Sequence, residues 1–353
     1  MIMAMGLNKI RHQFGAAFSV GEWNVNGGGS RFTAGTRAPI GLREKLPLLK
    51  EAGATHLEFH DTELPVDQCP DMRRALDDEG LRTGMVTANL FRRPEFINGA
   101  FDSPDPKVRK MAVEISQRYL SAGIEELDAE LYVYWVGTAG FDHEFAKDHV
   151  AHVRYIVDSL NEIVRYGLDQ HGKEKMIPVL IEPKPNEPRN YMYGGTVGDA
   201  LAIVSMMDPE LSPYVGVNPE KAHSTMAGLS YSLDLSMAIA AGKLGHVHLN
   251  DQSRPAFDQD YAFGDVDIMG CFSSIWTLKR SNYDGLIGLD VQPFGTDRED
   301  QYAESARRSI ANFHRFNVCC DRIDMAELEE AQRSGDQAAV ADLVNRALMG
   351  LDR

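Results

Sequence analysis

Short apolar runs alternate with amphipathic helical patterns through most of this chain. The run Ile177–Ile181 is apolar without alternation, which is typical of a strand buried on both faces. The segment Pro106–Ala122 spaces its apolar residues three and four positions apart, which is typical of a half-buried helix. By these patterns, strands are predicted over Phe14–Val20, His56–His60, Thr83–Ala88, Leu131–Trp135, Ile177–Ile181, Tyr214–Val217, His246–Leu249 and Leu286–Val291.

Helical patterns fill the intervals between the predicted strands. Gly123, Gly167 and Gly242 follow three of them and are predicted to be left-handed caps. The helices are predicted over Leu42–Glu51, Met72–Glu79, Pro106–Ala122, Glu144–Tyr166, Val197–Met206, Leu233–Ala241, Ile268–Arg280 and Asp300–Phe316.

Eight strand–helix units in alternation predict an α/β fold with eight parallel strands. A closed (β/α)8 TIM barrel accommodates these strands without an exposed edge. An open, doubly wound sheet is the alternative. No Gly-x-Gly-x-x-Gly follows the first strand, which weakens a dinucleotide-binding version of that alternative. Gly27–Gly29 precedes no obvious helix and is interpreted as a flexible loop.

The pattern changes after about residue 316. Two helices, Met325–Arg333 and Gln337–Met349, follow each other with no strand between them. We therefore predict a barrel domain over residues 1–316 and a short C-terminal helical extension over 317–353. This extension either packs on a neighbouring subunit or caps its own barrel.

Composition and charge restrict the partners. Hydrophobic residues make up 43% of the 353 positions and charged residues 25%, values typical of a globular protein in water. The net charge of −16 argues against nucleic acid and anionic membranes as partners, because both require a basic surface. No run of about 18 apolar residues is present, so no membrane span is predicted.

The cysteines and the amino-terminal residues indicate a reduced, cytoplasmic protein. Cys69, Cys271, Cys319 and Cys320 show no Cys-x-x-Cys spacing. The segment from Met1 to Gly6 lacks a basic region followed by a long apolar run, so no signal peptide is predicted.

The stretch Ile181–Arg189 contains the first candidate chemistry. Glu182 ends a predicted strand, and Lys184 lies between Pro183 and Pro185. Because proline restricts its own backbone and that of the preceding residue, Glu182 and Lys184 are expected to point the same way. A surface ion pair at a strand end is one interpretation. The other is a carboxylate that holds a cation, with an ammonium directed at the same ligand.

Acidic and imidazole residues also follow four other predicted strands. Residues at the carboxyl ends of barrel strands converge on one mouth, where several carboxylates repel each other unless cations lie between them. Oxygen ligands with an occasional imidazole suit Mg²⁺, Mn²⁺ or Co²⁺. Each element alone is weak, since an Asp-x-Asp pair is usually a solvated turn, but together they predict a metal site. The residues are His60, Asp61 and Glu63; Glu220 and His223; His248, Asp251, Asp258 and Asp260; and Asp290.

Several motifs resemble those of the xylose isomerase family, in order from about Phe14 to Phe316. The octapeptide from Glu182 to Arg189 is the most specific of them. The others are Phe59–Asp61, Met85–Phe91, Gly216–His223, Met226–Gly228, Ala241–Leu244, Asp258–Asp260 and Phe263–Gly264. The resemblance implies two divalent metal ions per subunit, one held by Glu182, Glu220, His248 and Asp290, and one held by Glu220, His223, Asp258 and Asp260.

The same resemblance implies roles for residues around the metals. His60, oriented by Glu63, would assist opening of the sugar ring, and Lys184 would donate to the carbonyl oxygen of the open-chain sugar. Phe91 and Trp135 would form an apolar wall, with Thr87 near the ring-oxygen end and Phe18 at a pocket position. The family is typically tetrameric, and Phe32 is the counterpart of an aromatic residue that enters the site from a neighbour. A homotetramer or homodimer is therefore expected.

Four departures from the family pattern surround the predicted site. His248 stands where the family has an aspartate, which removes one negative charge and shifts the expected metal preference from Mg²⁺ toward Mn²⁺ or Co²⁺. An imidazole at this point resembles L-rhamnose isomerase and the ketose 3-epimerases. Glu63 replaces an aspartate, Phe18 replaces a tryptophan, and Gln292 replaces a lysine. One interpretation of these departures is neutral drift in a xylose isomerase; the other is an altered sugar preference, or related chemistry on a keto-sugar, so the sugar itself is not predicted.

The predicted function is a metal-dependent aldose–ketose isomerase that acts on an unphosphorylated sugar by a 1,2-hydride shift. The alternative on the same scaffold is a 3-epimerase or lyase that acts on keto-sugars by proton transfer. Phosphodiester hydrolysis at an abasic site is disfavoured by the net charge. A non-catalytic sugar-binding protein is disfavoured because Lys184 and the ligand set are intact.

Overall fold

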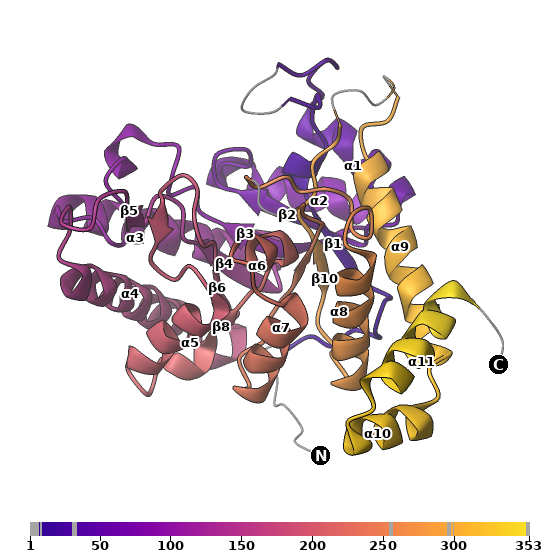
Figure 1. Cartoon of the computed structure of the whole chain (residues 1–353). Coiled ribbons are helices and arrows are strands. Elements are labelled where there is room, and N and C mark those ends of the chain that lie inside the picture. Colours follow the sequence, from indigo (N-terminus) through magenta and orange to yellow (C-terminus); the bar gives the residue numbers. More distant parts are fainter. Residues whose placement is uncertain are drawn as a thin grey trace.

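Eight parallel strands form a barrel, as predicted. The computed structural model describes residues 7, 9–29, 34–253, 257–294, 298 and 300–350. The barrel strands are β1 (Phe18–Gly21), β2 (His56–His60), β3 (Arg82–Thr87), β4 (Leu131–Trp135), β6 (Val179–Glu182), β8 (Val215–Val217), β9 (His248–Leu249) and β10 (Ile287–Leu289) (Figure 1).

The strand order closes the sheet on itself. Neighbours run β8–β6–β4–β3–β2–β1–β10–β9, and each pair is parallel. Parallel bridges Val217↔Leu244 and Glu220↔His248 then join the segment of β8 to that of β9. Because all strands point the same way, their carboxyl ends lie on one rim, where Trp135 pairs with Glu182 and His60 pairs with Thr87.

Helices cover the outside of the barrel, which explains why the strands are apolar on both faces. Three helices, α3, α5 and α8, match the predicted bounds, whereas the long helix α4 begins later and ends later than predicted. The helices are α1 (Leu42–Ala52), α2 (Cys69–Glu79), α3 (Pro106–Ala122), α4 (His149–Lys175), α5 (Val197–Met206), α6 (Lys221–Met226), α7 (Tyr231–Ala240), α8 (Ile268–Arg280) and α9 (Glu304–Asp321).

Short elements supplement this pattern. Strands β5 (Gly140–Phe141) and β7 (Tyr191–Met192) pair antiparallel beside the barrel mouth. Single helical turns are η1 (Glu22–Asn24), η2 (Val66–Gln68), η3 (Pro94–Phe96), η5 (Ser212–Tyr214) and a π-turn, η4 (Gly123–Leu127).

Two of the predicted glycine caps are wrong, and one is confirmed. Gly123 has right-handed helical angles and begins η4, so the chain continues through it. Gly167 lies inside α4, where a Cβ atom would stand 2.5 Å from Met176 Sδ, so close packing explains the glycine. Gly242 has φ +65° just after α7, as a left-handed cap requires.

The predicted first strand also begins too early, since Gly15 turns the chain at φ +76°.

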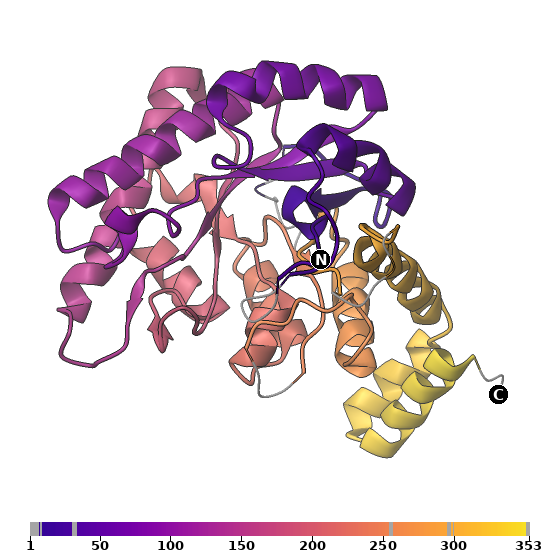
Figure 2. The same ribbon diagram turned by 90° about the horizontal axis from the view of Figure 1, so that it is seen from above.

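The C-terminal helices lie outside the ring of barrel helices. Helices α10 (Met325–Ser334) and α11 (Gln337–Met349) pack on each other, and α11 packs against α9, which itself runs past the predicted domain boundary at residue 316 (Figure 2). Leu328 and Leu343 belong to the same apolar cluster as the barrel core. None of the helices in the described part of the chain has both the length and the apolarity needed to cross a bilayer.

Candidate functional site

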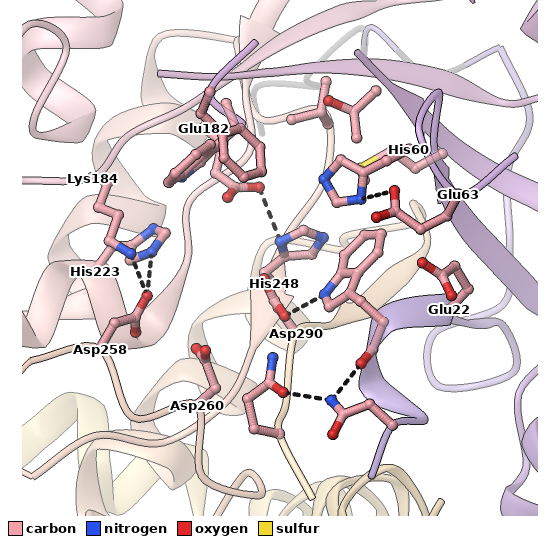
Figure 3. A pocket seen from close by; sticks show the side chains of 18 of the residues that line it. Glu22, His60, Glu63, Glu182, Lys184, His223, His248, Asp258, Asp260 and Asp290 are labelled. Atoms are coloured by element: carbon pink, nitrogen blue, oxygen red, sulfur yellow. Dashed lines mark hydrogen bonds and ion pairs between the residues drawn. The ribbon is translucent and has the colours of Figure 1, made fainter. Parts of the chain in front are cut away.

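A cavity of about 440 Å³ opens at the rim formed by the carboxyl ends of the strands. Twelve of the fifteen predicted site residues line it, so the sequence motifs do converge in space (Figure 3). These residues are His60, Glu63, Thr87, Phe91, Trp135, Glu182, Lys184, His223, His248, Asp258, Asp260 and Asp290.

The first group of candidate metal ligands comes from four segments that follow one another around the rim. Glu182 ends β6, Glu220 precedes α6, His248 begins β9 and Asp290 follows β10. One ligand atom from each lies within 4.8 Å of the others. His248 Nδ1 is 3.0 Å from Glu182 Oε2 and 3.7 Å from Glu220 Oε2. These are the four residues that the resemblance assigns to one metal.

A buried carboxylate, that of Glu58, sets the orientation of the His248 ring. Glu58 was not among the predicted site residues. Glu58 Oε2 lies 3.1 Å from His248 Nε2, and Glu58 Oε1 lies 3.1 Å from Nε2 of His246. Although burial opposes it, the charges of Glu58 and Glu182 raise the pKa of His248 well above its ordinary value. Glu58 therefore directs Nε2 away from the cavity and leaves Nδ1 facing the other ligands, an arrangement typical of metal-binding histidines.

A second group shares Glu220 with the first. His223 Nε2 lies 3.2 Å from Glu220 Oε1 and 3.2 Å from Asp258 Oδ2. Asp260 is not within the same 4.8 Å group, but it lines the cavity and is connected to Glu220 by Asn250. The Asn250 amide donates to Glu220 Oε1 at 2.8 Å and to Asp260 Oδ1 at 3.0 Å.

The electrostatics of the two groups suit divalent cations. Burial together with Glu220 raises the pKa of Asp290 to about 7, and burial together with Asp258 raises the pKa of Asp260 well above its ordinary range. Glu220 Oε2 and Asp258 Oδ1 are buried and have no hydrogen-bond partner among the described residues. Crowded carboxylates with buried, unsatisfied oxygens fit a site for hard cations.

Lys184 occupies the boundary between the second group and the open cavity. Its Nζ lies 2.6 Å from Asp258 Oδ2 and 5.5 Å from the centre of the Trp135 ring. Although burial opposes it, Asp258 raises the pKa of Lys184, so the side chain carries a positive charge at neutral pH. The Lys184 ammonium therefore faces the same cavity as the candidate metal-binding residues.

His60 lies on the opposite side of the cavity. Its Nδ1 is 4.0 Å from Glu63 Oε2, a distance that suits an ionic contact and is too long for a hydrogen bond. Glu63 also accepts a hydrogen bond of 3.0 Å from Arg92. Burial lowers the pKa of His60, so its ring is neutral at neutral pH. His60 and Glu63 therefore face each other, with Glu63 also accepting from Arg92 and, at the oxygen nearer His60, from the Thr62 hydroxyl.

An aromatic wall closes the remaining side. Phe91 and Trp135 meet edge to face with ring centres 4.6 Å apart. Thr87 lines the cavity, and its hydroxyl has no hydrogen-bond partner among the described residues, so it is free to bond a polar ligand.

Of the three predicted residues that are not among those lining the cavity, Glu220 is buried within the two ligand groups. Phe18 is buried on the outer side of β1, where it packs against Phe313 and His314 with ring centres 5.2 and 5.4 Å away. The reason is strand alternation, which places Phe18 and the cavity on opposite sides of the sheet. Phe32 lies outside the described residues.

Trp23 takes a place at the cavity that the sequence analysis did not anticipate. Its indole N–H donates to Asp290 Oδ1 at 2.7 Å, and its ring lies 4.5 Å from that of His60. Glu22 and Lys45 also line the cavity and form an ion pair of 2.5 Å. Trp23 lies just beyond the carboxyl end of the first strand, and this position in the sequence could have identified it as a residue of the cavity.

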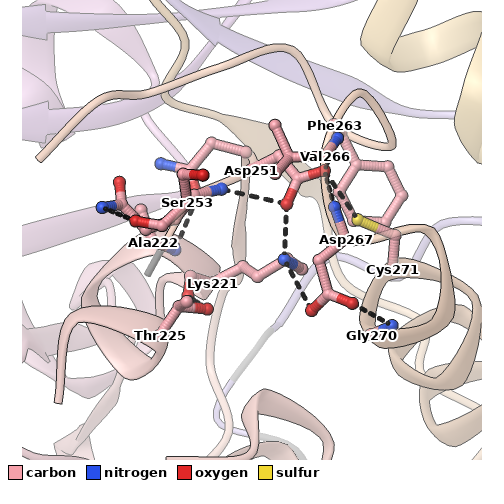
Figure 4. A network of polar contacts seen from close by, with 12 residues as sticks. Lys221, Ala222, Thr225, Asp251, Ser253, Phe263, Val266, Asp267, Gly270 and Cys271 are labelled. Atoms are coloured by element: carbon pink, nitrogen blue, oxygen red, sulfur yellow. Dashed lines mark hydrogen bonds and ion pairs between the residues drawn. The ribbon is translucent and has the colours of Figure 1, made fainter. Parts of the chain in front are cut away.

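A buried network holds α6, and with it Glu220 and His223, in place (Figure 4). Lys221 Nζ lies 2.7 Å from Asp251 Oδ1, and both side chains are almost fully buried. The other oxygen of Asp251 accepts from the backbone N–H groups of Val266 and Asp267 at 2.7 and 3.0 Å. The ligand-bearing turn is thus tied to the segment that precedes α8.

Comparisons with known proteins agree with the barrel fold and show the family. A family model described as a xylose isomerase-like TIM barrel matches residues 46–312. The xylose isomerase of Thermus thermophilus is 37% identical over 314 residues, which cover 84% of this chain and 78% of that protein. The xylose isomerase of Thermus caldophilus is 36% identical over 345 residues, which cover 92% and 86%.

Solved structures with lower identity share the fold. A 3-keto-D-glucoside 4-epimerase from E. coli, in its apo form, superposes with a TM-score of 0.60 at 20% identity, covering 78% of this chain and 95% of that chain. A D-tagatose 3-epimerase-like protein superposes with a TM-score of 0.63 at 17% identity, covering 85% and 98%. At these identities the likeness concerns the barrel alone.

Proposed function

Because the chain belongs to the xylose isomerase-like TIM barrel family and is therefore an isomerase, we propose that it is a metal-dependent aldose–ketose isomerase for an unphosphorylated sugar. The reaction is a 1,2-hydride shift that uses two divalent cations of the Mn²⁺, Mg²⁺ or Co²⁺ type. One observation carries the proposal: two candidate ligand groups share Glu220 beside the ammonium of Lys184. A carboxylate shared by the two groups would help to hold both cations, which would supply Lewis-acid chemistry to one sugar.

In this proposal Glu182, Glu220, His248 and Asp290 would hold one cation, and Glu220, His223, Asp258 and Asp260 would hold the other. When bound, the cations supply Lewis-acid polarisation of the sugar carbonyl and favour loss of a proton from the neighbouring hydroxyl. Imidazole in the first group makes it softer than an all-carboxylate group, which favours Mn²⁺ or Co²⁺.

The side chains of this chain perform the remaining work. His60 is neutral, so it takes the proton of the anomeric hydroxyl and returns it to the ring oxygen as the sugar ring opens, and Glu63 positions its imidazole. Lys184 donates to the carbonyl oxygen and stabilises the negative charge that develops there. Phe91 and Trp135 exclude water from the carbon atoms between which hydrogen moves. Hydrogen migrates with its electron pair from one carbon to the next. One hydroxyl loses a proton, and the former carbonyl oxygen gains one. The two changes balance, so no external oxidant is needed.

Epimerisation at the third carbon by proton transfer is the second candidate. His248, in a position where the resembled isomerases carry an aspartate, is the observation that favours it. Such a reaction needs a base that removes a proton from carbon and returns it to the opposite face. The carboxylates on both sides of the cavity are the groups available for this task.

A deuterium experiment separates the two reactions. The chelator-treated protein is incubated with a panel of pentoses, hexoses and deoxysugars in D₂O, with Mn²⁺, Co²⁺ or Mg²⁺ added, and the products are identified by NMR. A ketose without deuterium on carbon supports the hydride shift. An epimer with deuterium at the inverted carbon supports proton transfer instead. Absence of turnover across the panel with every metal contradicts the isomerase proposal.

We also propose that the protein is a homotetramer or homodimer in which Phe32 of one subunit reaches the cavity of another. Light scattering gives the mass of the particle directly. Phe32→Ala is expected to lower turnover several-fold while leaving metal binding unchanged. A monomer with full turnover contradicts this part of the proposal.

A further inference from the structure

A second cluster of ligand-type side chains lies at the opposite end of the barrel from the cavity. It consists of His12 in the amino-terminal segment, His56 at the first position of β2 and Glu130 just before β4. We propose that these three residues form a separate site for one zinc-type divalent cation. His56 and His60 begin and end the same strand, so the two sites are about 13 Å apart along β2.

The three ligand atoms are close enough to share one ion. His12 Nε2 lies 2.8 Å from Glu130 Oε2, and His56 Nε2 lies 3.1 Å from Glu130 Oε1. All three ligand atoms lie within 4.8 Å of one another, and the imidazole rings meet edge to face with centres 5.2 Å apart. A tetrahedral zinc ion with bonds of about 2.1 Å separates its ligand atoms by about 3.4 Å. The cluster therefore needs only small side-chain shifts to accept it.

The orientation of His56 supplies a second, independent reason. His56 is 4% exposed, and its Nε2 has no hydrogen-bond partner among the described residues although Glu130 is 3.1 Å away. His56 Nε2 and Glu130 Oε1 are therefore close together, but no N–H of the imidazole points at the carboxylate oxygen. A cation placed between them satisfies both atoms, whereas a direct hydrogen bond requires the imidazole to turn.

The other nitrogen of His56 is already engaged. Thr55 Oγ1 lies 2.8 Å from His56 Nδ1, and the same hydroxyl donates to the carbonyl oxygen of Phe18 at 3.2 Å. The hydroxyl has a single hydrogen, so in the tautomer in which it donates to Phe18, Nδ1–H is the donor to Thr55 and the lone pair lies on Nε2. Metal-binding histidines are typically held in this way by a partner at the second nitrogen.

The donor set distinguishes this site from the cavity. Two imidazoles and one carboxylate are the ligands that zinc prefers, whereas the cavity is rich in carboxylates and suits harder ions. The cluster is also partly open, since the side chains of His12 and Glu130 are 12% and 9% exposed, so a water molecule can complete the coordination. A bound ion would tie the amino-terminal segment to β2 and β4.

The alternative is a cluster of ion pairs that needs no metal. The test compares the wild-type protein with His12→Ala, which removes a ligand from the surface segment and leaves the buried strands intact. Arg11→Ala is the control, because Arg11 is exposed and pairs with Asp284. Each chelator-treated protein is titrated with Zn²⁺ in the presence of saturating Mg²⁺, and bound zinc is measured after desalting, together with the melting temperature.

The expected result is one zinc equivalent fewer in His12→Ala than in the wild type and in Arg11→Ala, with a smaller zinc-induced rise in melting temperature. Anomalous diffraction at the zinc edge should show a peak between the three side chains. Equal zinc content in all three proteins, or zinc peaks confined to the cavity, overturns the proposal. Because His12 is remote from the cavity, His12→Ala should turn over sugar normally, so this test and that of the proposed function fail independently.

Discussion

The ammonium of Lys184 lies 2.6 Å from Asp258 Oδ2, the same oxygen that lies 3.2 Å from His223 Nε2. One carboxylate oxygen thus connects the proposed substrate-binding lysine with a proposed metal ligand. A cation bound by Asp258 would repel the Lys184 ammonium, so we expect occupancy of the second metal group to move Lys184 away from Asp258. This coupling makes Lys184 a test of the whole arrangement.

Lys184→Met should lower kcat by about 10²–10³-fold, because removing a preorganised donor to a developing negative charge costs this much in other enzymes. The methionine keeps most of the volume of the side chain, so the fold should survive. Steady-state kinetics on the sugar found in the panel provides the measurement. Lys110→Met is the control, since Lys110 forms an exposed pair with Glu114 on α3. Equal loss in both variants would show that the effect is not specific to the cavity.

Glu220→Gln removes the carboxylate that both ligand groups share. An amide has one oxygen and no charge, so affinity for both ions should fall, and the two-ion complex should no longer form at metal concentrations that saturate the wild type. Calorimetric titration with Mn²⁺ measures the stoichiometry and affinity. Glu114→Gln on the exposed face of α3 is the control. If Glu220→Gln still binds two ions with unchanged affinity, the shared-ligand arrangement is wrong.

Glu58→Gln tests how His248 is held. Glutamine offers one acceptor oxygen where glutamate offers two, so either His246 or His248 faces an amide NH₂ in place of its charged acceptor. Loss of such a partner typically costs 10–100-fold in metal affinity. The measurement is Mn²⁺ affinity by calorimetry, with circular dichroism to confirm the fold and Glu79→Gln at the surface as control. A metal affinity equal to that of the wild type would show that Glu58 does not position His248.

Trp23→Phe isolates the hydrogen bond to Asp290. Phenylalanine retains an aromatic ring beside His60 and removes only the indole N–H, which donates at 2.7 Å. A hydrogen bond to a charged group contributes about 1.5–3 kcal/mol, so metal affinity of the first group should fall by about ten-fold or more. Trp276→Phe is a matched control, because the Trp276 indole N–H has no hydrogen-bond partner in the part of the chain that the structure describes. Equal metal affinity in both variants would contradict the proposed role of Trp23.

The sequence predicted the barrel well because local patterns carry that information. Each of the eight barrel strands overlaps a predicted apolar run, and three helices match their predicted bounds. Sequence position at a strand end also predicted which residues meet, since parallel strands bring their carboxyl ends to one rim.

What the sequence did not reveal depends on the direction in which side chains point. Phe18 was expected in the pocket, but its strand turns it outward, whereas Trp23, five positions later, reaches the cavity. Glu58 was missed because a carboxylate inside an apolar strand has no local signal. Its role appears only when His246 and His248, almost 190 positions away along the chain, are brought beside it.

The buried pair of Lys221 and Asp251 gives a last prediction, about stability. Lys221→Met leaves Asp251 buried and charged beside Cys271, with the backbone N–H donors of Gln252, Val266 and Asp267 but no cation among the described residues to compensate its charge. Breaking a buried pair in this way typically costs about 3–5 kcal/mol, which should appear as a lower free energy of unfolding in urea. Lys50→Met is the control, because Lys50 and Glu79 form an exposed pair whose loss costs less than about 1 kcal/mol. Since α6 bears His223 and directly follows Glu220, Lys221→Met should also weaken metal binding, whereas Lys50→Met should not. If Lys221→Met unfolds at the same urea concentration as the wild type, the network does not stabilise this end of the barrel.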